Sequence, residues 1–486
     1  MTRLTQELRL YNKPNYFGAL VIWWLFFLIY FLVNNIESFI LFLILPPVFI
    51  FMFHVALSKR YVVMSMFFAL VFISQAINPA FFFLNKNDFI NAPAWAVDDF
   101  NFDLPEFFFA YKDMYLLLIC IFIFTLVLNR IFVRPRLKIT IEAKDTQSNR
   151  KKSKKQSVLT KQNGMLYAQY IYLLMVFIAI PLNFFMYTHG VGISTVEPEH
   201  LPFKLVGITF YVRNYIIPVL LMYLYFKSTR TRMLSLLILL YGMLVGILSL
   251  SKGNILLTLS PVILFSYLDG HKLRLFISVM YGIFLYLFVS WARQFVFISD
   301  IGSLDMIINI FSHVSENDFF DWNILPNFFA AISDRLYGAQ YTLLANQFDL
   351  ADNVQETLNF LIANTDHLSQ IIYTEVFRLP IFDGVVVGVN IGYLNILILL
   401  ANKNLLLLTF LALVTALYLT VAELIIYKYI SMNKYFGLIG YPLAFFMVFF
   451  LFDGVIGKFY FVFMLSVIGL FLIKLLPPPL LTKLAL

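Results

Sequence analysis

The chain has 486 residues, of which 61% are hydrophobic and only 13% are charged, and its formal net charge is +8. A soluble domain cannot hide so much apolar surface, so this composition predicts a protein whose main solvent is lipid. The single cysteine, Cys120, lies in an apolar run, which excludes a disulfide framework and a thiolate metal site. We therefore expect an all-α polytopic membrane protein.

Apolar runs long enough to cross a bilayer follow one another along the chain. The first, residues 16–33, has no small-residue cleavage site after it, so we expect a retained span rather than a signal peptide. The other predicted spans cover residues 39–57, 61–84, 114–133, 166–187, 205–226, 233–250, 254–268, 275–291, 405–426, 435–452 and 458–475. About twelve transmembrane helices result.

Basic residues fall on one side of these spans. Arg3 and Lys13 precede the first span, Lys59 follows the second, and the basic linker 134–164 follows the fourth. The positive-inside rule makes this side cytoplasmic and places the N-terminus there. A basic tract next to a membrane span is typical of a topology signal, and we do not expect nucleic acid as a partner.

The opposite side is acidic. An outer loop at residues 85–113 is rich in aspartate, and a much larger extracytoplasmic loop at residues 294–383 has only Arg335 and Arg378 as cations. Its amphipathic stretches, residues 306–314 and 328–344, predict short helices lying on the membrane.

These features divide the chain into a transmembrane region at residues 1–293, the large loop, and a second transmembrane region at residues 384–486. Within the latter, residues 384–401 either span the membrane or form a re-entrant segment. The re-entrant alternative keeps Lys428, Lys434 and the C-terminus on the cytoplasmic side and gives twelve spans rather than thirteen.

Cations in or beside the outer halves of apolar spans are the residues whose burial in a bilayer costs the most free energy. Arg213, Lys252 and Arg293 are of this kind, although Lys252 and Arg293 could also extend to the interface. Together with Arg335 and Arg378 they are nearly the only cations on the acidic outer face. Guanidinium groups bind phosphate oxygens in pairs, so these five residues are candidates for holding the pyrophosphate of a lipid carrier.

The large loop also offers candidates for acid–base chemistry. Asp366, His367 and Glu375 could deprotonate an acceptor hydroxyl in a glycosyl transfer, while cations take up the charge of the leaving group. No metal or other cofactor is expected. Each of these three residues could equally be a solvated or helix-capping side chain. The sequence has no Walker loop, zinc-protease motif or serine-hydrolase elbow, which disfavours an ATP-driven pump and those two hydrolase classes.

Two short motifs and the overall layout resemble the O-antigen and exopolysaccharide repeat-unit polymerases of the Wzy type. The sequence Gly-Ile-Leu-Ser-Leu-Ser-Lys-Gly-Asn at residues 246–254 is similar to the Gly-Ser-Arg-Gly turn of that family, with lysine replacing arginine. The sequence Gly-Val-Asn-Ile-Gly-Tyr-Leu at residues 388–394 resembles the Asn-Phe-Gly-Tyr element that follows the large loop.

The resemblance implies a GT-C-like helical enzyme of the bacterial inner membrane that acts on its outer face. Such an enzyme transfers a glycan from undecaprenyl pyrophosphate to the next lipid-linked repeat unit, and a chain-length regulator is a candidate partner. Arg213, Lys252, Arg293 and Arg335 would then hold pyrophosphate, and Asp366, His367 or Glu375 would orient the acceptor. Two alternatives stay open: a flippase for the same lipid-linked glycans, or another outer-face glycosyltransferase such as an O-antigen ligase.

Overall fold

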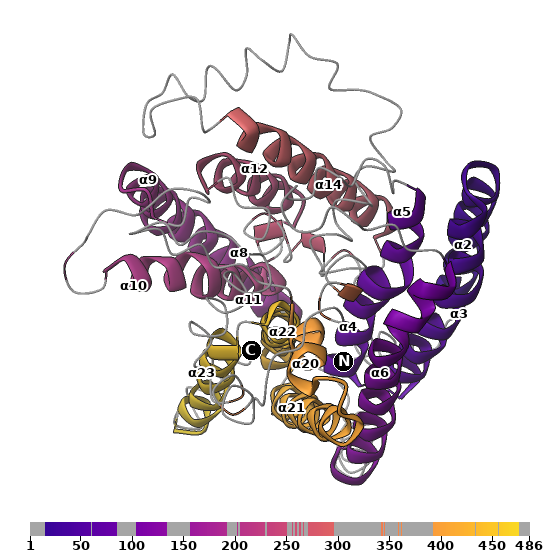
Figure 1. Ribbon diagram of the computed structural model, residues 1–486. Helices are drawn as coiled ribbons and strands as arrows, with labels where there is room; N and C mark the ends of the chain where they lie inside the picture. Colours follow the sequence, from indigo (N-terminus) through magenta and orange to yellow (C-terminus); the bar gives the residue numbers. More distant parts are fainter. Residues whose placement is uncertain are drawn as a thin grey trace. The chain divides into compact units, whose positions relative to one another are not determined.

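The computed structural model is helical in almost all the residues that it describes (Figure 1). These are residues 15–59, 61–84, 104–133, 156–191, 202, 205–228, 231–249, 255, 258–259, 262–263, 266, 271–295, 342–343, 345, 358, 361, 392–432, 434–454 and 456–475. The chain forms two compact units. Unit 1 comprises Met1–Ser148, Leu325–Met432 and Leu443–Leu481, and unit 2 comprises Asn149–Ile324, Asn433–Pro442 and Thr482–Leu486.

Among the described residues, six helices are long and apolar enough to cross a bilayer. They are Ile36–Ser58, Val62–Leu84, Leu104–Phe132, Met165–Thr188, Arg232–Ser249 and Leu405–Tyr429. Each coincides with a predicted span, so the expectation of a helical multi-pass membrane protein is confirmed in this coarse form. Shorter apolar helices overlap four further predicted spans, at Trp24–Asn34, Leu273–Tyr286, Leu443–Asp453 and Ile456–Phe471. The total of twelve spans stays a prediction.

Unit 1 begins with a helical hairpin. Helix α2 (Asn15–Asn34) is joined to α3 (Ile36–Ser58) through Asn35, whose side chain caps α3 by accepting a hydrogen bond from Ser38 N–H at 3.0 Å. The Asn35 amide also donates to the Phe83 carbonyl at 3.2 Å, which joins the start of α3 to the end of α5 (Asn78–Leu84). The ring of Phe31 lies 5.0 Å from that of Phe42 and 5.1 Å from that of Phe81. Aromatic packing thus holds these three helices together.

Helix α6 (Leu104–Phe132) begins ten residues before the predicted span at 114–133, inside the range expected for the outer acidic loop. Phe107, Tyr111, Met114 and Leu118 recur at helical spacing and are buried. The rings of Phe107 and Tyr111 stack with centroids 4.2 Å apart. The helix therefore extends past the polar residues at its start because its apolar face continues there.

Helix α20 (Tyr393–Ala401) is short and completely buried. Gly392, just before the helix, has φ 81°, a conformation that favours glycine, and Asn402, just after it, is left-handed. The helix therefore starts and stops at these two residues. Nine residues rise only about 14 Å, less than half the ~30 Å hydrocarbon core, so α20 does not cross a bilayer by itself.

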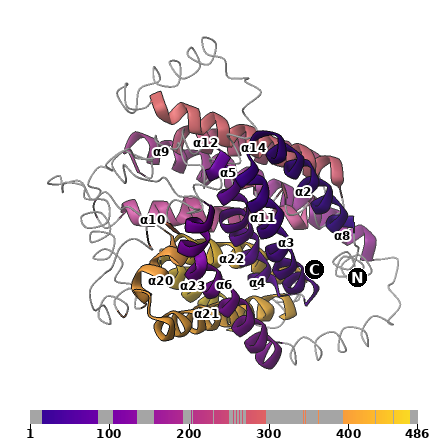
Figure 2. The same cartoon turned by 45° about the vertical axis from the view of Figure 1, so that its right-hand side comes forward.

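A three-residue turn joins α20 to α21 (Leu405–Met432), and both views show these helices side by side (Figures 1 and 2). The Oδ1 atom of Asn404 caps α21 by accepting hydrogen bonds from Leu406 N–H at 3.0 Å and Leu407 N–H at 3.2 Å. Residues 402–404 therefore form a tight helix–helix connection. Two further helices, α22 (Lys434–Asp453) and α23 (Ile456–Leu475), follow.

Only a few residues of the predicted large loop are described, and they are helical. Thr342, Leu343 and Ala345 are buried, and the Thr342 hydroxyl donates to Asn395 Oδ1 in α20 at 2.8 Å. The stretch 328–344 was expected to lie on the membrane surface. Its C-terminal end instead packs inside unit 1, because Asn395 offers a buried acceptor there. The other residues of that stretch and the stretch 306–314 lie outside the described residues.

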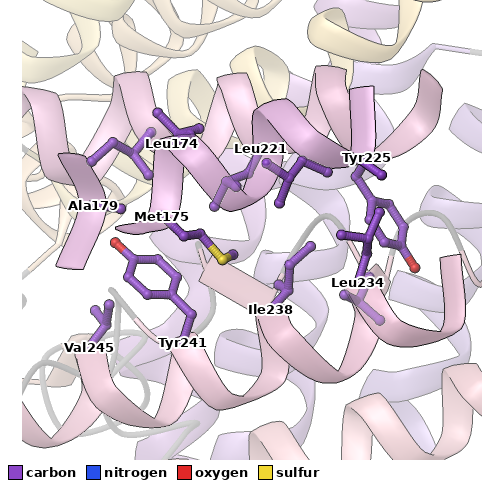
Figure 3. Close-up of a cluster of buried hydrophobic side chains, with 13 residues drawn as sticks. Leu174, Met175, Ala179, Leu221, Tyr225, Leu234, Ile238, Tyr241 and Val245 are labelled. Carbon is purple, nitrogen blue, oxygen red and sulfur yellow. The ribbon is translucent and has the colours of Figure 1, made fainter. Parts of the chain in front are cut away.

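Unit 2 contains α8 (Gln156–Leu174), η3 (Met175–Ala179), α9 (Ile180–Thr188), α10 (Leu205–Tyr211), η5 (Val212–Ile216), α11 (Ile217–Lys227), α12 (Thr231–Ser249) and α14 (Lys272–Phe295). Helix α8 begins inside the predicted basic linker 134–164. An apolar cluster joins the helices of this unit, with Met175, Leu221, Ile238 and Tyr241 among its members (Figure 3).

Glycines let another segment approach α12 closely. A Cβ atom at Gly242 would lie 2.7 Å from Leu259, and one at Gly246 would lie 3.0 Å from Ile255. Their spacing of four residues places both on one face of the helix, the pattern that membrane helices use for close packing.

Candidate functional site

Three of the described helical stretches contain a π-helical segment, and each segment ends two residues before a proline. The segments are η1 (Phe72–Ile77) before Pro79, η3 before Pro181 and η5 before Pro218. The first residue after each segment donates its N–H to the carbonyl five residues earlier: Asn78 to Ile73, Ile180 to Met175 and Ile217 to Val212. Proline has no N–H and its ring clashes with the carbonyl four residues earlier, which lies inside the segment each time. The wider turn accommodates that carbonyl.

The segment η5 carries Arg213, the cation that the sequence makes hardest to explain as a surface residue. Its side chain is only 4% exposed, inside a helix whose other residues are mostly apolar. A buried guanidinium in such a helix is costly unless polar groups surround it. π-helical segments are rare and occur frequently at functional sites, so η5 and its buried arginine form a candidate functional site.

Tyr241 of α12 and Asn183 of α9 provide polar groups in this part of unit 2. The hydroxyl of Tyr241 interacts electrostatically with the Arg213 guanidinium and accepts a hydrogen bond from the Asn183 amide at 2.8 Å. The same amide donates to the Ala179 carbonyl in η3 at 2.7 Å. The Tyr241 hydroxyl points from α12 toward Ala179, as Figure 3 shows. We call Arg213, Tyr241 and Asn183 the arginine cluster.

The cluster is buried and retains some hydrogen-bonding capacity. Asn183 is 1% exposed, and its Oδ1 atom accepts no hydrogen bond from any described residue. A buried carbonyl oxygen without a donor carries a desolvation cost of about 1–3 kcal/mol. The cluster therefore combines a cation, a hydroxyl and an acceptor within an apolar bundle.

The three members lie in the halves of their helices that the predicted topology assigns to the outer side. Arg213 is about 12 Å along the helix from the start of α10, Tyr241 about 12 Å from the end of α12, and Asn183 about 8 Å from the end of α9, at 1.5 Å per residue. The predicted topology assigns all three of these helix ends to the outer side. On that topology the cluster would lie within the bilayer, where a cation normally faces the protein interior or a water-filled cavity.

Of the eight predicted site residues, Arg213 alone has a described side chain. Arg293 lies in α14, where only its backbone is described. The remaining six lie outside the described residues: Lys252, Arg335, Arg378, Asp366, His367 and Glu375. The convergence of five cations on one pyrophosphate therefore stays a prediction.

A second buried charge, in unit 1, was not predicted. Glu423 in α21 is 2% exposed, and its carboxylate accepts hydrogen bonds from the N–H groups of Val62 at 2.6 Å, Val63 at 2.8 Å and Met64 at 3.2 Å. These are the first N–H groups of α4 (Val62–Val71), which have no partner within their own helix. A lone carboxylate in an apolar run could have pointed to a buried acidic residue. Its partners could not be identified from the sequence, because Val63, for example, lies 360 positions away.

The arginine cluster can bind an oxyanion or stabilise negative charge, because a guanidinium and a hydroxyl both donate hydrogen bonds. Among the described residues, no three histidine, cysteine, aspartate or glutamate side chains are grouped as metal ligands. Comparison with known proteins found no matching family model, no similar curated protein and no similar solved structure.

Proposed function

We propose that this protein polymerises lipid-linked oligosaccharide repeat units on the outer face of a bacterial inner membrane. The observation that carries the proposal is the buried guanidinium of Arg213, held in a π-helical segment beside Tyr241 and Asn183 of a multi-pass helical protein. The resemblance of residues 246–254 and 388–394 to repeat-unit polymerases adds to it.

The reaction joins two lipid-linked glycans. An acceptor hydroxyl oxygen forms a bond with the anomeric carbon of the donor glycan, the bond between that carbon and the pyrophosphate oxygen breaks, and undecaprenyl pyrophosphate leaves. The hydroxyl proton passes to a base, for which Asp366, His367 and Glu375 are the candidates. Negative charge grows on the pyrophosphate as the bond breaks, and a cation at that position lowers the barrier.

On this proposal Arg213 binds the leaving pyrophosphate, together with Lys252, Arg293, Arg335 and Arg378. Tyr241 and Asn183 position Arg213, because Tyr241 interacts with its guanidinium and Asn183 donates to Tyr241. A guanidinium keeps its charge at any working pH and can donate two parallel hydrogen bonds to one phosphate. Lysine at position 213 would keep the charge and lose that geometry.

The test is a deletion strain of the native host complemented with variants. We expect deletion to abolish the ladder of long surface polysaccharides on a gel while the product with one repeat unit remains. Arg213→Ala should fail to restore the ladder at unchanged membrane abundance, whereas Arg130→Ala should restore it fully. Arg130 is an exposed arginine near the end of α6, so it controls for the loss of a cation.

The alternatives give different products. A flippase would lose both the ladder and the one-repeat product on deletion, and a ligase would retain polymer on its lipid carrier without transferring it. A normal ladder in the deletion strain would overturn the proposal, and a normal ladder with Arg213→Ala would remove Arg213 from the site. Purified protein should also lengthen synthetic undecaprenyl-linked repeat units without ATP.

Tyr241→Phe tests whether the Tyr241 hydroxyl positions Arg213, without disturbing the packing of the helices. This substitution keeps the ring in the apolar cluster and removes only the hydroxyl. We expect polymer yield to fall about 5- to 10-fold, since a lost hydrogen bond of this kind is worth ~1–1.5 kcal/mol. Unchanged yield would mean that Tyr241 does not position Arg213.

A further inference from the structure

An open groove lies between α12 and α14, and no residue of the arginine cluster is among its described lining residues. Its volume is about 710 Å3, and it is lined by Arg232, Ser235, Leu236, Leu239, His271, Leu273, Arg274, Ile277 and Ser278. Both helices contribute residues from their N-terminal halves, so they run parallel, and both views show them side by side (Figures 1 and 2). The hydroxyl of Tyr281 donates to the Leu239 carbonyl at 3.2 Å and joins the two helices next to the groove.

The lining combines positive charge with exposed apolar surface. Arg232 is exposed and Arg274 is half-buried, and both line the same hollow together with His271. Leu236 is 60% and Leu273 72% exposed. None of the described residues that line the groove carries a carboxylate. A water-filled anion site would not need large exposed leucines, and a purely lipid-facing groove would not hold two arginines.

We infer that this groove binds the headgroup and upper acyl chains of an anionic phospholipid. The phosphate of such a lipid is a bidentate acceptor for Arg232 and Arg274, and its acyl chains cover Leu236, Leu273 and Ile277. Ser235 and Ser278 do not compete for the phosphate as donors, because Ser235 pairs with the Tyr225 hydroxyl and Ser278 donates to the Arg274 carbonyl at 2.8 Å. Both arginines therefore carry the recognition.

The predicted topology assigns this end of α12 and α14 to the cytoplasmic side, where positive residues accumulate and anionic lipids are bound by basic pockets between helices. The inference does not depend on that orientation, since it uses only the lining of the groove. Nor does it depend on the proposed polymerase activity.

The experiment measures lipid binding to the purified full chain in neutral detergent. Phosphatidylglycerol is titrated and bound lipid is counted by native mass spectrometry, with phosphatidylcholine as the neutral lipid. The test variant is Arg232→Gln with Arg274→Gln, and its matched control is Lys59→Gln with Arg130→Gln. The control removes two exposed cations that the predicted topology assigns to the same side.

We expect phosphatidylglycerol to bind the wild type and the control equally and the test variant about 30-fold more weakly, at roughly fivefold for each arginine. Binding should also weaken as salt is added. Because Arg274 is half-buried, Arg232→Gln alone is the second variant. Arg232 is exposed, so its substitution should leave the fold intact and weaken binding about fivefold.

Three outcomes would overturn the inference. Phosphatidylcholine could bind as tightly as phosphatidylglycerol, the control could lose as much affinity as the test variant, or inorganic phosphate could displace phosphatidylglycerol at equal concentration. The last result would assign the two arginines to a free anion rather than to a lipid.

Discussion

Among the described residues, each unit buries one acidic or basic side chain inside an apolar helix, and the surroundings of these two side chains differ. In unit 1, both oxygens of Glu423 accept hydrogen bonds from backbone N–H groups at the start of α4. The positive end of the helix dipole also favours a carboxylate at this position. In unit 2, Arg213 lies in a π-helical segment, and the neighbouring Asn183 oxygen has no donor among the described residues.

On the proposed function, this difference distinguishes a charge that supports the fold from one that serves the reaction. Three N–H groups occupy most of the acceptor positions of the buried Glu423 carboxylate, so this side chain links α21 to α4. Arg213 lies in a turn of irregular geometry beside side chains that can change partners. Changes in unit 1 should therefore alter stability first, and changes around Arg213 should alter activity first.

Glu423→Ala should have the largest effect on stability. It leaves three N–H groups of α4 without an acceptor, and we expect a loss of about 3–5 kcal/mol in the free energy of unfolding. The measurement is thermal unfolding in detergent followed by tryptophan fluorescence, together with abundance in membranes. Arg213→Ala in parallel should retain abundance and lose polymer. If Glu423→Ala kept its abundance and lost polymer, the distinction between the two charges would be wrong.

Gly469→Ala should destabilise unit 1 without removing any charge. A Cβ atom at Gly469 in α23 would clash with the Tyr429 hydroxyl of α21, which donates to the Ser466 carbonyl at 2.7 Å. Overpacking of this kind costs about 1–3 kcal/mol. Thermal unfolding should show the loss, and the protein that remains folded should make polymer at the normal rate. Gly207→Ala is the control, because nothing lies within 4 Å of the added atom.

Pro218→Ala, in unit 2, should lower activity without lowering stability, the reverse of the substitutions in unit 1. The new N–H can donate to the carbonyl that η5 accommodates, so the helix can return to regular α geometry and gain about 1 kcal/mol. The same change rotates Arg213 relative to Tyr241, so polymer yield should fall while the melting temperature stays equal or rises. Pro46→Ala in α3 is the control, since that helix contains proline without a π-helical segment. Unchanged polymer in both variants would show that η5 does not position Arg213.

The spans were predictable because each is a local apolar run, and six of them coincide with long apolar helices. The boundaries of the helices were less predictable. The polar residues Glu106, Lys112 and Asp113 concealed the start of α6, whose buried face continues through Phe107 and Tyr111. Local composition does not reveal a buried face that depends on other helices.

The polar contacts inside the units depend on distant partners. Arg213 was predicted as a costly cation, but Tyr241 and Asn183 look like ordinary residues of apolar helices until the fold brings them together. The prolines at 79, 181 and 218 could have pointed to irregular turns, yet Pro46 and Pro47 lie in a regular helix. Proline thus allows a π-helical segment without requiring one.

Lys403→Gly should have the smallest effect and again concerns unit 1. Lys403 has φ 61° in the turn between α20 and α21, a conformation that glycine adopts more readily than lysine, and its side chain is exposed. We expect the free energy of unfolding to rise by about 0.5–1 kcal/mol, because relief of the left-handed strain exceeds the added flexibility of the unfolded chain. Polymer should be unchanged, since the turn only connects two helices. Lys428→Gly, within α21, should instead destabilise by about 1 kcal/mol, because glycine is a poor helix former there. Equal melting temperatures for the two variants would show that the turn carries no strain.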